Sequence, residues 1–200
     1  MTEPHDYEVV SAEVVFRGRV IALHADCVRM PGGGTSQRDW VEHLGAVGVV
    51  ALDGQGRVLL VNQYRHPVRK RLEELPAGLL DVEGEPALTA ARRELAEEAG
   101  LAADSWQVLV DALTSPGMSD EAIRLYLARG VRVVDRDVQE HEESELTSCW
   151  VPLEEAVRRV LAGEVENAMA CIGILAADRA ARDGFTALRP ADSPWLSRPG

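Results

Sequence analysis

Three glutamates at helical spacing constrain this chain more than any other feature of its sequence. Glu94, Glu97 and Glu98 stand at positions i, i+3 and i+4 of a segment expected to be helical, so their carboxylates share one face. Carboxylates this close repel one another unless solvent screens them or a strong positive charge binds between them. The pattern therefore indicates either a solvated acidic face or a site for a divalent cation such as Mg²⁺.

The helix that carries these glutamates is expected over residues 86–99. Pro86 suits the first helical position, where the amide hydrogen that proline lacks would have no partner, and Gly100 suits the left-handed residue beyond the C-terminus. Arg93 lies one turn before Glu97 and is expected to hold its carboxylate. The face turned to the core is predicted from apolar residues at helical spacing, which are Leu88, Ala91, Leu95 and Ala99.

Length and charge narrow the class of protein. Two hundred residues, 46% of them apolar, suffice to fill the core of one domain. No stretch approaches 18 uncharged apolar residues, and the polar, acidic start is unlike a signal peptide, so we expect no membrane partner. A net charge of −12 argues against nucleic acid as a partner, because a polyanion needs compensating Lys and Arg.

The cysteines point to a reducing compartment. Cys27, Cys149 and Cys171 are odd in number and show no C-x-x-C spacing. This favours buried free thiols over disulfides or a zinc site, and hence a cytoplasmic location.

The hydrophobic pattern divides the chain into three parts. Residues 1–44 hold β-rich runs over 7–16, 19–30 and 37–43, with Pro-Gly-Gly-Gly at 31–34 as a turn. Residues 45–183 form the core domain, and residues 184–200 a proline-containing tail that is expected to be extended or disordered. Within the core domain, strands are expected over 47–52, 58–64, 106–113, 123–128 and 147–151, and two final helices over 153–161 and 165–182.

This order of elements predicts the fold class. Mixed strands with one helix among them and two helices at the end favour an α/β (α+β) fold, in which a mixed sheet lies between helices as a three-layer α/β/α sandwich. A small N-terminal β domain precedes it.

A longer motif surrounds the three glutamates. Gly78, Glu85, Arg93 and the Gly100-Leu101 pair stand with them at fixed spacing, and together these residues resemble the Nudix box. That motif reads Gly, five residues, Glu, seven residues, Arg-Glu, apolar, any, Glu-Glu, any, Gly, apolar. Chance agreement at seven fixed positions is about one in a million for this length. One departure exists, because six residues rather than five separate Gly78 from Glu85.

The resemblance extends to the ADP-ribose pyrophosphatase-like subgroup of Nudix hydrolases. In that subgroup, an N-terminal β segment similar to residues 1–44 is exchanged between the two subunits of a homodimer. Pro116 lies sixteen residues after Gly100, a spacing that in the family marks enzymes acting on ADP-ribose. A plain loop between strands is the alternative interpretation of Pro116-Gly117.

The resemblance implies a metal centre. It implies two or three Mg²⁺ ions, with Mn²⁺ as a substitute, held by Glu94, Glu98 and the carbonyl oxygen of Ala77. Glu97 would be a shared or outer ligand with a catalytic role, oriented by Arg93. Such ions neutralise the phosphate oxygens and lower the pKa of a bound water.

A second acidic segment, residues 141–145, is similar to the loop that supplies the general base in related enzymes. Glu143 is the expected base and a further metal ligand, while Glu142 and Glu145 stay open because spacing does not fix the register of a loop. His141 ranks below these carboxylates, since a metal-activated water needs only a weak base. A solvated acidic loop is the alternative.

Substrate contacts are likewise implied by the resemblance. Arg65, at the end of Gln63-Tyr64-Arg65, could form a bidentate pair with a phosphate, although a surface arginine is the alternative. Arg38 and Glu42 would reach the site from the partner subunit. The remaining implied contacts are Leu79, through its backbone, and Gly117, Met118 and Glu121.

The expected reaction is hydrolysis of the pyrophosphate bond of ADP-ribose to AMP and ribose 5-phosphate. Another nucleoside diphosphate sugar, such as GDP-mannose, is the alternative substrate. A ligand-sensing Nudix module without catalysis is the alternative class. It is disfavoured because all three glutamates of the box are present and the C-terminal helices are not strongly basic.

Overall fold

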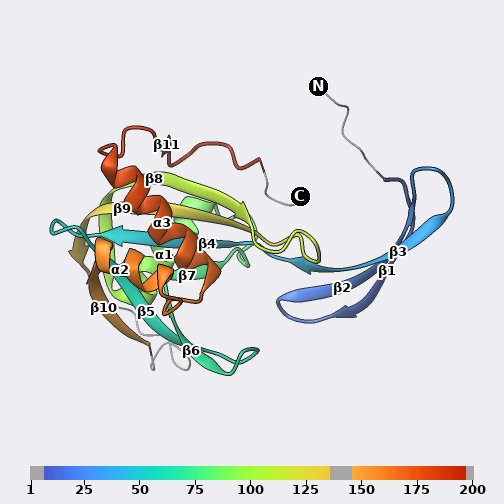
Figure 1. Ribbon diagram of the computed structural model, residues 1–200, viewed down its shortest axis with the longest axis horizontal. Coiled ribbons are helices and arrows are strands. Elements are labelled where there is room, and N and C mark those ends of the chain that lie inside the picture. Colours follow the sequence, from blue (N-terminus) through green and yellow to red (C-terminus); the bar gives the residue numbers. More distant parts are fainter. Residues whose placement is uncertain (1–6, 136–145, 197–200) are drawn as a thin grey trace.

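The computed structural model describes residues 7–135 and 146–196, which form two separate β-sheets and, in this described part, three helices (Figure 1). The smaller sheet has the order β1-β2-β3 and extends away from the rest of the molecule; we call it the arm. Its strands are β1 (Val9–Arg17), β2 (Ile21–Arg29) and β3 (Thr35–His43), all antiparallel.

The larger sheet has the strand order β10-β5-β4-β9-β8-β11, with β6 beside β5 and β7 beside β4. The neighbours β4 and β9 run parallel, whereas the other described pairs are antiparallel, so the sheet is mixed as predicted. Its strands are β4 (Ala46–Leu52), β5 (Arg57–Arg65), β6 (Lys70–Glu74), β7 (Ala77–Leu79), β8 (Leu101–Leu113), β9 (Ala122–Val133), β10 (Thr147–Pro152) and β11 (Arg189–Pro190).

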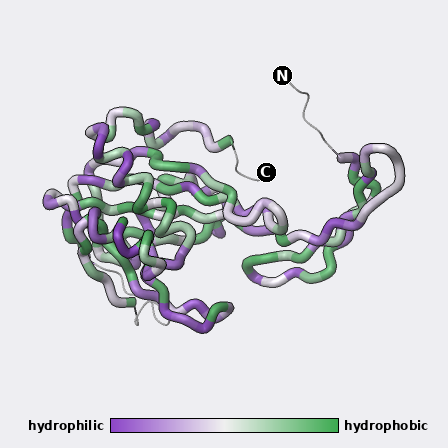
Figure 2. The backbone as a smooth tube through the Cα atoms, viewed as in Figure 1, coloured by the Kyte–Doolittle hydropathy of each residue, from purple (hydrophilic) through white to green (hydrophobic). Residues whose placement is uncertain are grey.

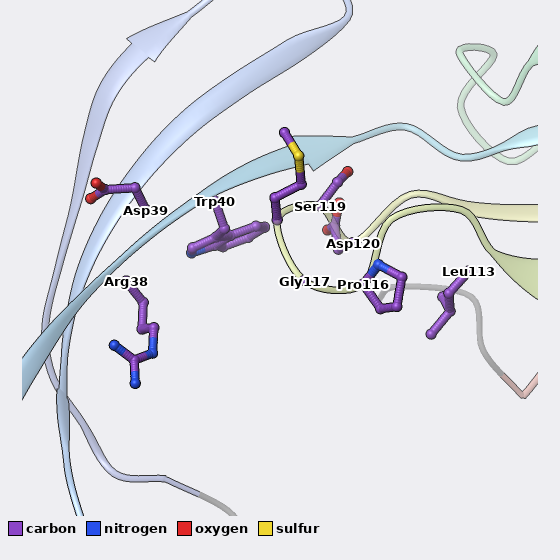
Figure 3. A pocket seen from close by; sticks show the side chains of 9 residues that line it. Arg38, Asp39, Trp40, Leu113, Pro116, Gly117, Ser119 and Asp120 are labelled. Atoms are coloured by element: carbon purple, nitrogen blue, oxygen red, sulfur yellow. The ribbon is translucent and has the colours of Figure 1, made fainter.

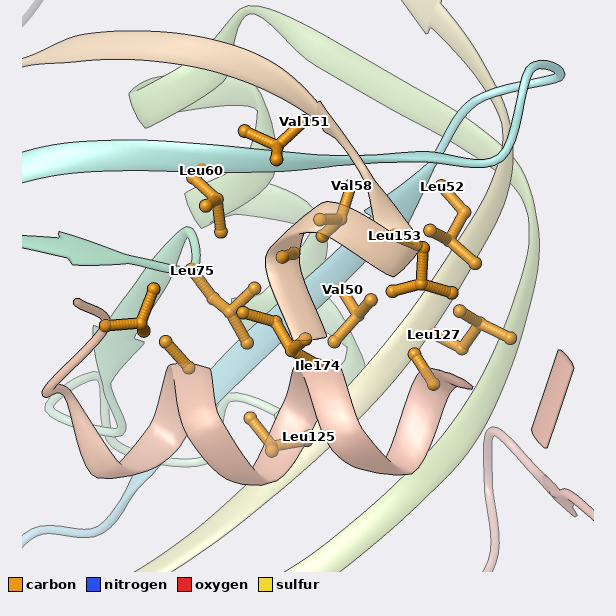
Figure 4. Packing of buried hydrophobic residues seen from close by; sticks show 14 residues of the cluster. Val50, Leu52, Val58, Leu60, Leu75, Leu125, Leu127, Val151, Leu153 and Ile174 are labelled. Carbon is orange, nitrogen blue, oxygen red and sulfur yellow. The ribbon is translucent and has the colours of Figure 1, made fainter. Parts of the chain in front are cut away.

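Helices cover both faces of the larger sheet. Helix α1 (Ala87–Ala99) packs on one face, and α2 (Leu153–Leu161) and α3 (Ala168–Arg182) pack on the other (Figure 4). Strand β4 is buried along its whole length because its alternating side chains enter both cores. Val47 and Val49 face the α1 side, and Val50 and Leu52 face the α3 side. The predicted three-layer sandwich is confirmed.

Several predicted boundaries are wrong for identifiable reasons. Pro86 precedes the helix instead of opening it, because its ψ of 141° is extended, and α1 begins at Ala87. Helix α3 begins at Ala168 rather than residue 165, since the Asn167 side chain caps it by accepting a hydrogen bond from Ala170 N. Strand β8 begins five residues earlier than predicted, because the chain from Leu101 to Ser105 pairs with the end of β9.

The end of α1 and its buried face agree with the prediction, whereas three short strands of the larger sheet lie outside it. Gly100 has the expected left-handed conformation, with φ of 63°. The face of α1 turned to the core is the predicted one, since Ala91 and Leu95 are buried in that core and the half-buried Leu88 and Ala99 pack against it. Strands β6, β7 and β11 were not predicted, since each is short and depends on pairing with a longer neighbour.

The arm exposes apolar surface. Every residue of β1 is exposed, and Figure 2 shows hydrophobic stretches along the arm. Its exposed apolar residues are Val9, Val10, Val14, Val15, Phe16, Val20, Ile21 and Leu23. The chain passes from the arm into β4 through Leu44 and Gly45, and Gly45 has a φ of 79° with the carbonyl oxygen of Ala122 beside it. A side chain at Gly45 would be strained.

Two further expectations concern the thiols and the membrane. All three cysteines are free, as predicted, but Cys149 is exposed and Cys27 and Cys171 are half-buried, so the expectation that they are buried is wrong. In residues 7–135 and 146–196, no helix has the length and apolar character needed to cross a membrane.

Candidate active site

Arg93 is the centre of a cluster of glutamates on α1 and the loop before it. Its Nη1 atom donates to Glu94 Oε1 at 2.7 Å and to Glu97 Oε2 at 3.0 Å, which confirms the predicted contact with Glu97. Its Nε and Nη2 atoms donate to both carboxylate oxygens of Glu85, at 3.2 and 3.1 Å. The Glu85 hydrogen bonds, more than any other contact, raise the pKa of Arg93. One guanidinium therefore fixes three carboxylates.

The extra residue in the loop before α1 does not displace Glu85. Gly84 has a φ of 76°, and the amide of Glu85 donates to the carbonyl oxygen of Val82 at 3.1 Å, so the chain closes a tight turn there. Glu85 still reaches Arg93. The departure from the motif is thus absorbed in the turn and leaves the cluster intact.

Glu94 is held close to the backbone of β7. A β-carbon built on Gly78 would lie closer than 3.0 Å to the Glu94 carboxyl group, so only glycine leaves room for it. The Glu94 side chain is largely buried. Burial raises the pKa of Glu94, and the carboxylates of Glu97 and Asp81 add to that rise while Arg93 opposes it. The surroundings of Glu94 thus disfavour its negative charge and would favour an added cation.

Glu98 ties the end of α1 to the same strand. It is 8% exposed, and its Oε2 atom accepts a hydrogen bond from the amide of Ala77 at 2.9 Å. Strand β7 in turn pairs with β4, with Ala77 opposite Gly48 and Gly78 opposite Val47. The structure therefore places the Ala77-Gly78 backbone beside both Glu94 and Glu98.

The donor set at this cluster suits a hard divalent cation. Carboxylate and backbone carbonyl oxygens are the ligands that Mg²⁺ prefers. The glycine at position 78 leaves a space filled by the Glu94 carboxyl group, and burial, with a smaller contribution from the carboxylates of Glu97 and Asp81, raises the pKa of Glu94. Within residues 7–135 and 146–196, however, no three His, Cys, Asp or Glu side chains form a ready-made metal-binding group. Arg93 and the amide of Ala77 hold the carboxylates instead.

A pocket of 430 Å³ lies between the arm and the loop that joins β8 to β9 (Figure 3). Figure 3 shows Arg38 and Trp40 on the arm side and Pro116 on the loop side. Three predicted substrate residues, Arg38, Gly117 and Met118, meet here. The complete lining is Arg38, Asp39, Trp40, Leu113, Pro116, Gly117, Met118, Ser119 and Asp120.

Backbone hydrogen bonds join the two walls of the pocket. The amide of Val41 on β3 donates to the carbonyl oxygen of Met118 at 2.9 Å, and the amide of Asp120 donates to the carbonyl oxygen of Val41 at 3.2 Å. The Asp120 carboxylate also accepts from the amide of His43 at 2.8 Å. The arm and the β8–β9 loop therefore form one continuous surface.

Trp40 was not predicted as a site residue, although the sequence carries a signal for it. It lies two residues from both Arg38 and Glu42 on one strand, so the three side chains share a face. Its Nε1 atom donates to Asp26 at 2.8 Å, and its ring stacks on His24 with centroids 4.3 Å apart. These contacts fix the ring at the pocket.

Four predicted substrate residues do not line the pocket in the described part of the chain. Arg65 forms a bidentate pair with the buried Glu74, at 2.9 and 2.7 Å. The positions of the other three are as follows: Glu42 bonds to Arg17 and His24, Glu121 accepts from the Thr114 hydroxyl and lies 3.7 Å from His43, and Leu79 pairs with Ala46. The expected base Glu143, with Glu142, Glu145 and His141, lies outside the described residues.

Comparison with known proteins gives consistent results. The NUDIX domain family matches residues 42–170. The chain is 53% identical to the ADP-ribose pyrophosphatase of Mycobacterium tuberculosis over 98% of this chain and 94% of that protein. It is 35% identical to the ADP-ribose pyrophosphatase of Bacillus subtilis over 84% of this chain and 90% of that protein. The crystal structure of an ADP compounds hydrolase has the same fold, with a TM-score of 0.76 at 18% identity over 90% of this chain and 96% of that one.

Proposed function

The chain belongs to the Nudix family, and we propose that it hydrolyses the pyrophosphate bond of ADP-ribose to AMP and ribose 5-phosphate. The observation that carries this proposal is the cluster in which Arg93 fixes Glu85, Glu94 and Glu97 beside Gly78. The two ADP-ribose pyrophosphatases that align over most of this chain support the choice of substrate.

Nudix hydrolases act with divalent metal ions, and a bound ion would neutralise phosphate oxygens and lower the pKa of a coordinated water. We propose Mg²⁺ as that ion, with two or three per site and Mn²⁺ as a substitute. Glu94, Glu97, Glu98 and the Ala77 carbonyl oxygen would hold it. Arg93 keeps Glu94 and Glu97 in place before the ion arrives.

The general base is proposed to be Glu143, which would accept the proton of the attacking water. Glu143→Gln should lower turnover by about 10²-fold or more, while the substrate still binds. The matched variants Glu142→Gln and Glu145→Gln should each lower turnover less. A larger loss in either of these two would assign the base to that residue instead.

We place the nucleoside portion of the substrate in the pocket between the arm and the β8–β9 loop. Trp40 offers a ring face for a base, and the Arg38 guanidinium supplies donors beside it. Gly117 carries no side chain, so the β8–β9 loop can approach a ligand closely there. Arg65, Leu79, Glu121 and Glu42 remain proposed contacts that would need the substrate present to engage it.

The proposed assembly is a homodimer in which residues 1–44 are exchanged between subunits. Its support is the exposed apolar surface of the arm, since β1, β2 and the turn between them together carry eight exposed large apolar side chains in the range 9–23. A surface of this kind on a small three-stranded sheet is typical of a protein–protein interface. Arg38 and Glu42 would then contribute to the active site of the other subunit.

A substrate panel tests the proposed activity. Purified protein is incubated with ADP-ribose or GDP-mannose, with and without Mg²⁺, and the nucleoside monophosphate product is measured. We expect AMP from ADP-ribose, in the presence of Mg²⁺, at a kcat/KM at least about tenfold above that for GDP-mannose. A preference for GDP-mannose would make the chain a different nucleoside diphosphate sugar hydrolase. If neither substrate were hydrolysed in the presence of Mg²⁺, the proposed hydrolase activity would be contradicted.

A further inference from the structure

The segment after α3 is fastened to the larger sheet by one buried arginine. Arg124 on β9 is 3% exposed, and its Nη1 atom donates to the carbonyl oxygen of Ser193 at 2.7 Å. Its Nη2 atom donates to the carbonyl oxygen of Pro194 at 3.0 Å. The ring of Trp195 lies over the guanidinium at 5.0 Å. We call residues 189–195 the C-terminal strap; Figure 1 shows the chain after α3 passing along the β8 edge of the sheet.

The same arginine is locked to the neighbouring strand. Its Nε and Nη2 atoms donate to the two carboxylate oxygens of Asp111 on β8, at 2.7 and 3.0 Å. Asp111 also forms an ion pair with Arg189 of the C-terminal strap, whose Nη1 atom lies 2.9 Å from Asp111 Oδ2. Arg189 and Pro190 pair with β8 as strand β11. Because Arg124 is buried, each of its donors needs a partner, and the strap supplies two of them.

The Arg124–Asp111 pair lies close to the β8–β9 loop. Asp111 and Arg124 are direct partners in the β8–β9 ladder, and two more pairs follow before the loop begins at Thr114. The amide of Thr114 donates to the carbonyl oxygen of Glu121 at 3.2 Å and so closes the loop. The loop then lines the pocket and bonds to β3. The position of the loop therefore depends on how firmly its two supporting strands are held.

We propose that the C-terminal strap is a positioning element for substrate binding, with Trp195 as the residue that holds it over Arg124. Trp195 acts through Arg124, Asp111 and the β8–β9 loop and does not touch the substrate. The strap thereby sets the shape of the pocket at Gly117 and Met118 without taking part in the chemistry. This inference rests on the proposed function for its kinetic consequence.

Steady-state kinetics on three single variants test the strap. Trp195→Ala removes the ring above Arg124, and we expect the KM for ADP-ribose to rise about 3–10-fold with kcat within about twofold of wild type. Trp195→Phe keeps a smaller aromatic ring face over Arg124, and the indole N–H that it loses has no partner among the described residues, so its KM should stay close to that of wild type. Leu196→Ala, at the adjacent residue that is 93% exposed, is the matched control and should leave both constants unchanged.

Hydrogen exchange separates this proposal from the proposed function. In Trp195→Ala, the amides of residues 114–121, apart from Pro116, and of Val41 should exchange faster than in wild type, while those of α2 keep the wild-type rate. This result would support the strap even if ADP-ribose were not the substrate. Unchanged exchange at these amides, an unchanged KM in Trp195→Ala, or an equal KM defect in Trp195→Phe would overturn the proposal while leaving hydrolysis of ADP-ribose standing.

Discussion

The carboxyl group of Glu94 lies against the α-carbon of Gly78, in the place where any other residue would carry its β-carbon. This contact, and not an unusual backbone angle, is the reason for glycine at the first position of the motif. Helix α1 and strand β7 can approach this closely because one side chain is missing. The glutamate at the centre of the proposed metal site is therefore positioned by a residue that has no side chain.

Gly78→Ala is expected to abolish most activity while the protein stays folded. The new methyl group would displace the Glu94 carboxyl group, and a displacement of about 1 Å in a catalytic group costs on the order of 10² in turnover. Gly54→Ala is the matched control, since a β-carbon there meets nothing within 4 Å. Initial rates with ADP-ribose, together with circular dichroism to check the fold, measure the effect. Wild-type turnover in Gly78→Ala would contradict the role given to Glu94.

Glu98→Gln should remove a negative charge from the proposed metal site without disturbing the fold around it. The glutamine keeps an oxygen that can accept the hydrogen bond from Ala77 N, so the fold should be retained. It removes one negative charge, and we expect turnover to fall by roughly 10²–10⁴. Glu83→Gln, an exposed change in the loop before α1, should have no effect. Wild-type-like turnover in Glu98→Gln would exclude Glu98 as a metal ligand.

The ion pair between Asp111 and Arg124 predicts a pH-dependent contribution to stability. Burial alone would raise the pKa of Asp111, but hydrogen bonds and charges from Arg124 and Arg189 outweigh it and hold that pKa below its usual range. A carboxylate with a lowered folded-state pKa contributes stability that is complete above its unfolded pKa of about 3.9 and is lost as the pH falls through the folded value.

Thermal unfolding of wild type and Asp111→Asn at several pH values measures this contribution. We expect Asp111→Asn to lower Tm most at pH 6 and progressively less as the pH falls through the lowered folded-state pKa of Asp111, below which the wild-type carboxylate is neutral too. Asp104→Asn, at a carboxylate that is 73% exposed, is the control and should show little difference at any pH. A Tm difference that stays constant with pH would show that the charge of Asp111 does not stabilise the fold.

Light scattering at micromolar concentration tests the proposed dimer. A species of twice the 21.8 kDa chain mass is expected, and deletion of residues 1–44 should yield a monomer that has lost activity. A milder variant, Val14→Asp together with Phe16→Asp, places charges in the exposed apolar surface of β1 and should also weaken association. A fully active 21.8 kDa species would defeat the proposal.

Local signals in the sequence predicted much of this structure, and long-range pairing accounts for what they missed. Helix α1 and the Arg93–Glu97 contact follow from spacing within a few residues of the chain. The pairing of Arg65 with Glu74 spans the β5–β6 hairpin, and the docking of Trp195 on Arg124 joins residues 71 positions apart. No periodicity within one segment reports such partners, because they depend on strand order in the sheet.

The connection between the arm and the larger sheet is too short to isolate one from the other. Only Leu44 and Gly45 separate β3 from β4, and β4 is the fully buried central strand that pairs with β7, the strand bearing Ala77 and Gly78. Gly45 makes the bend between the two, and its positive φ is a conformation that glycine adopts more readily than any other residue. If a bound subunit displaced the arm, the displacement would therefore reach β4, in the middle of the larger sheet, directly through the two connecting residues.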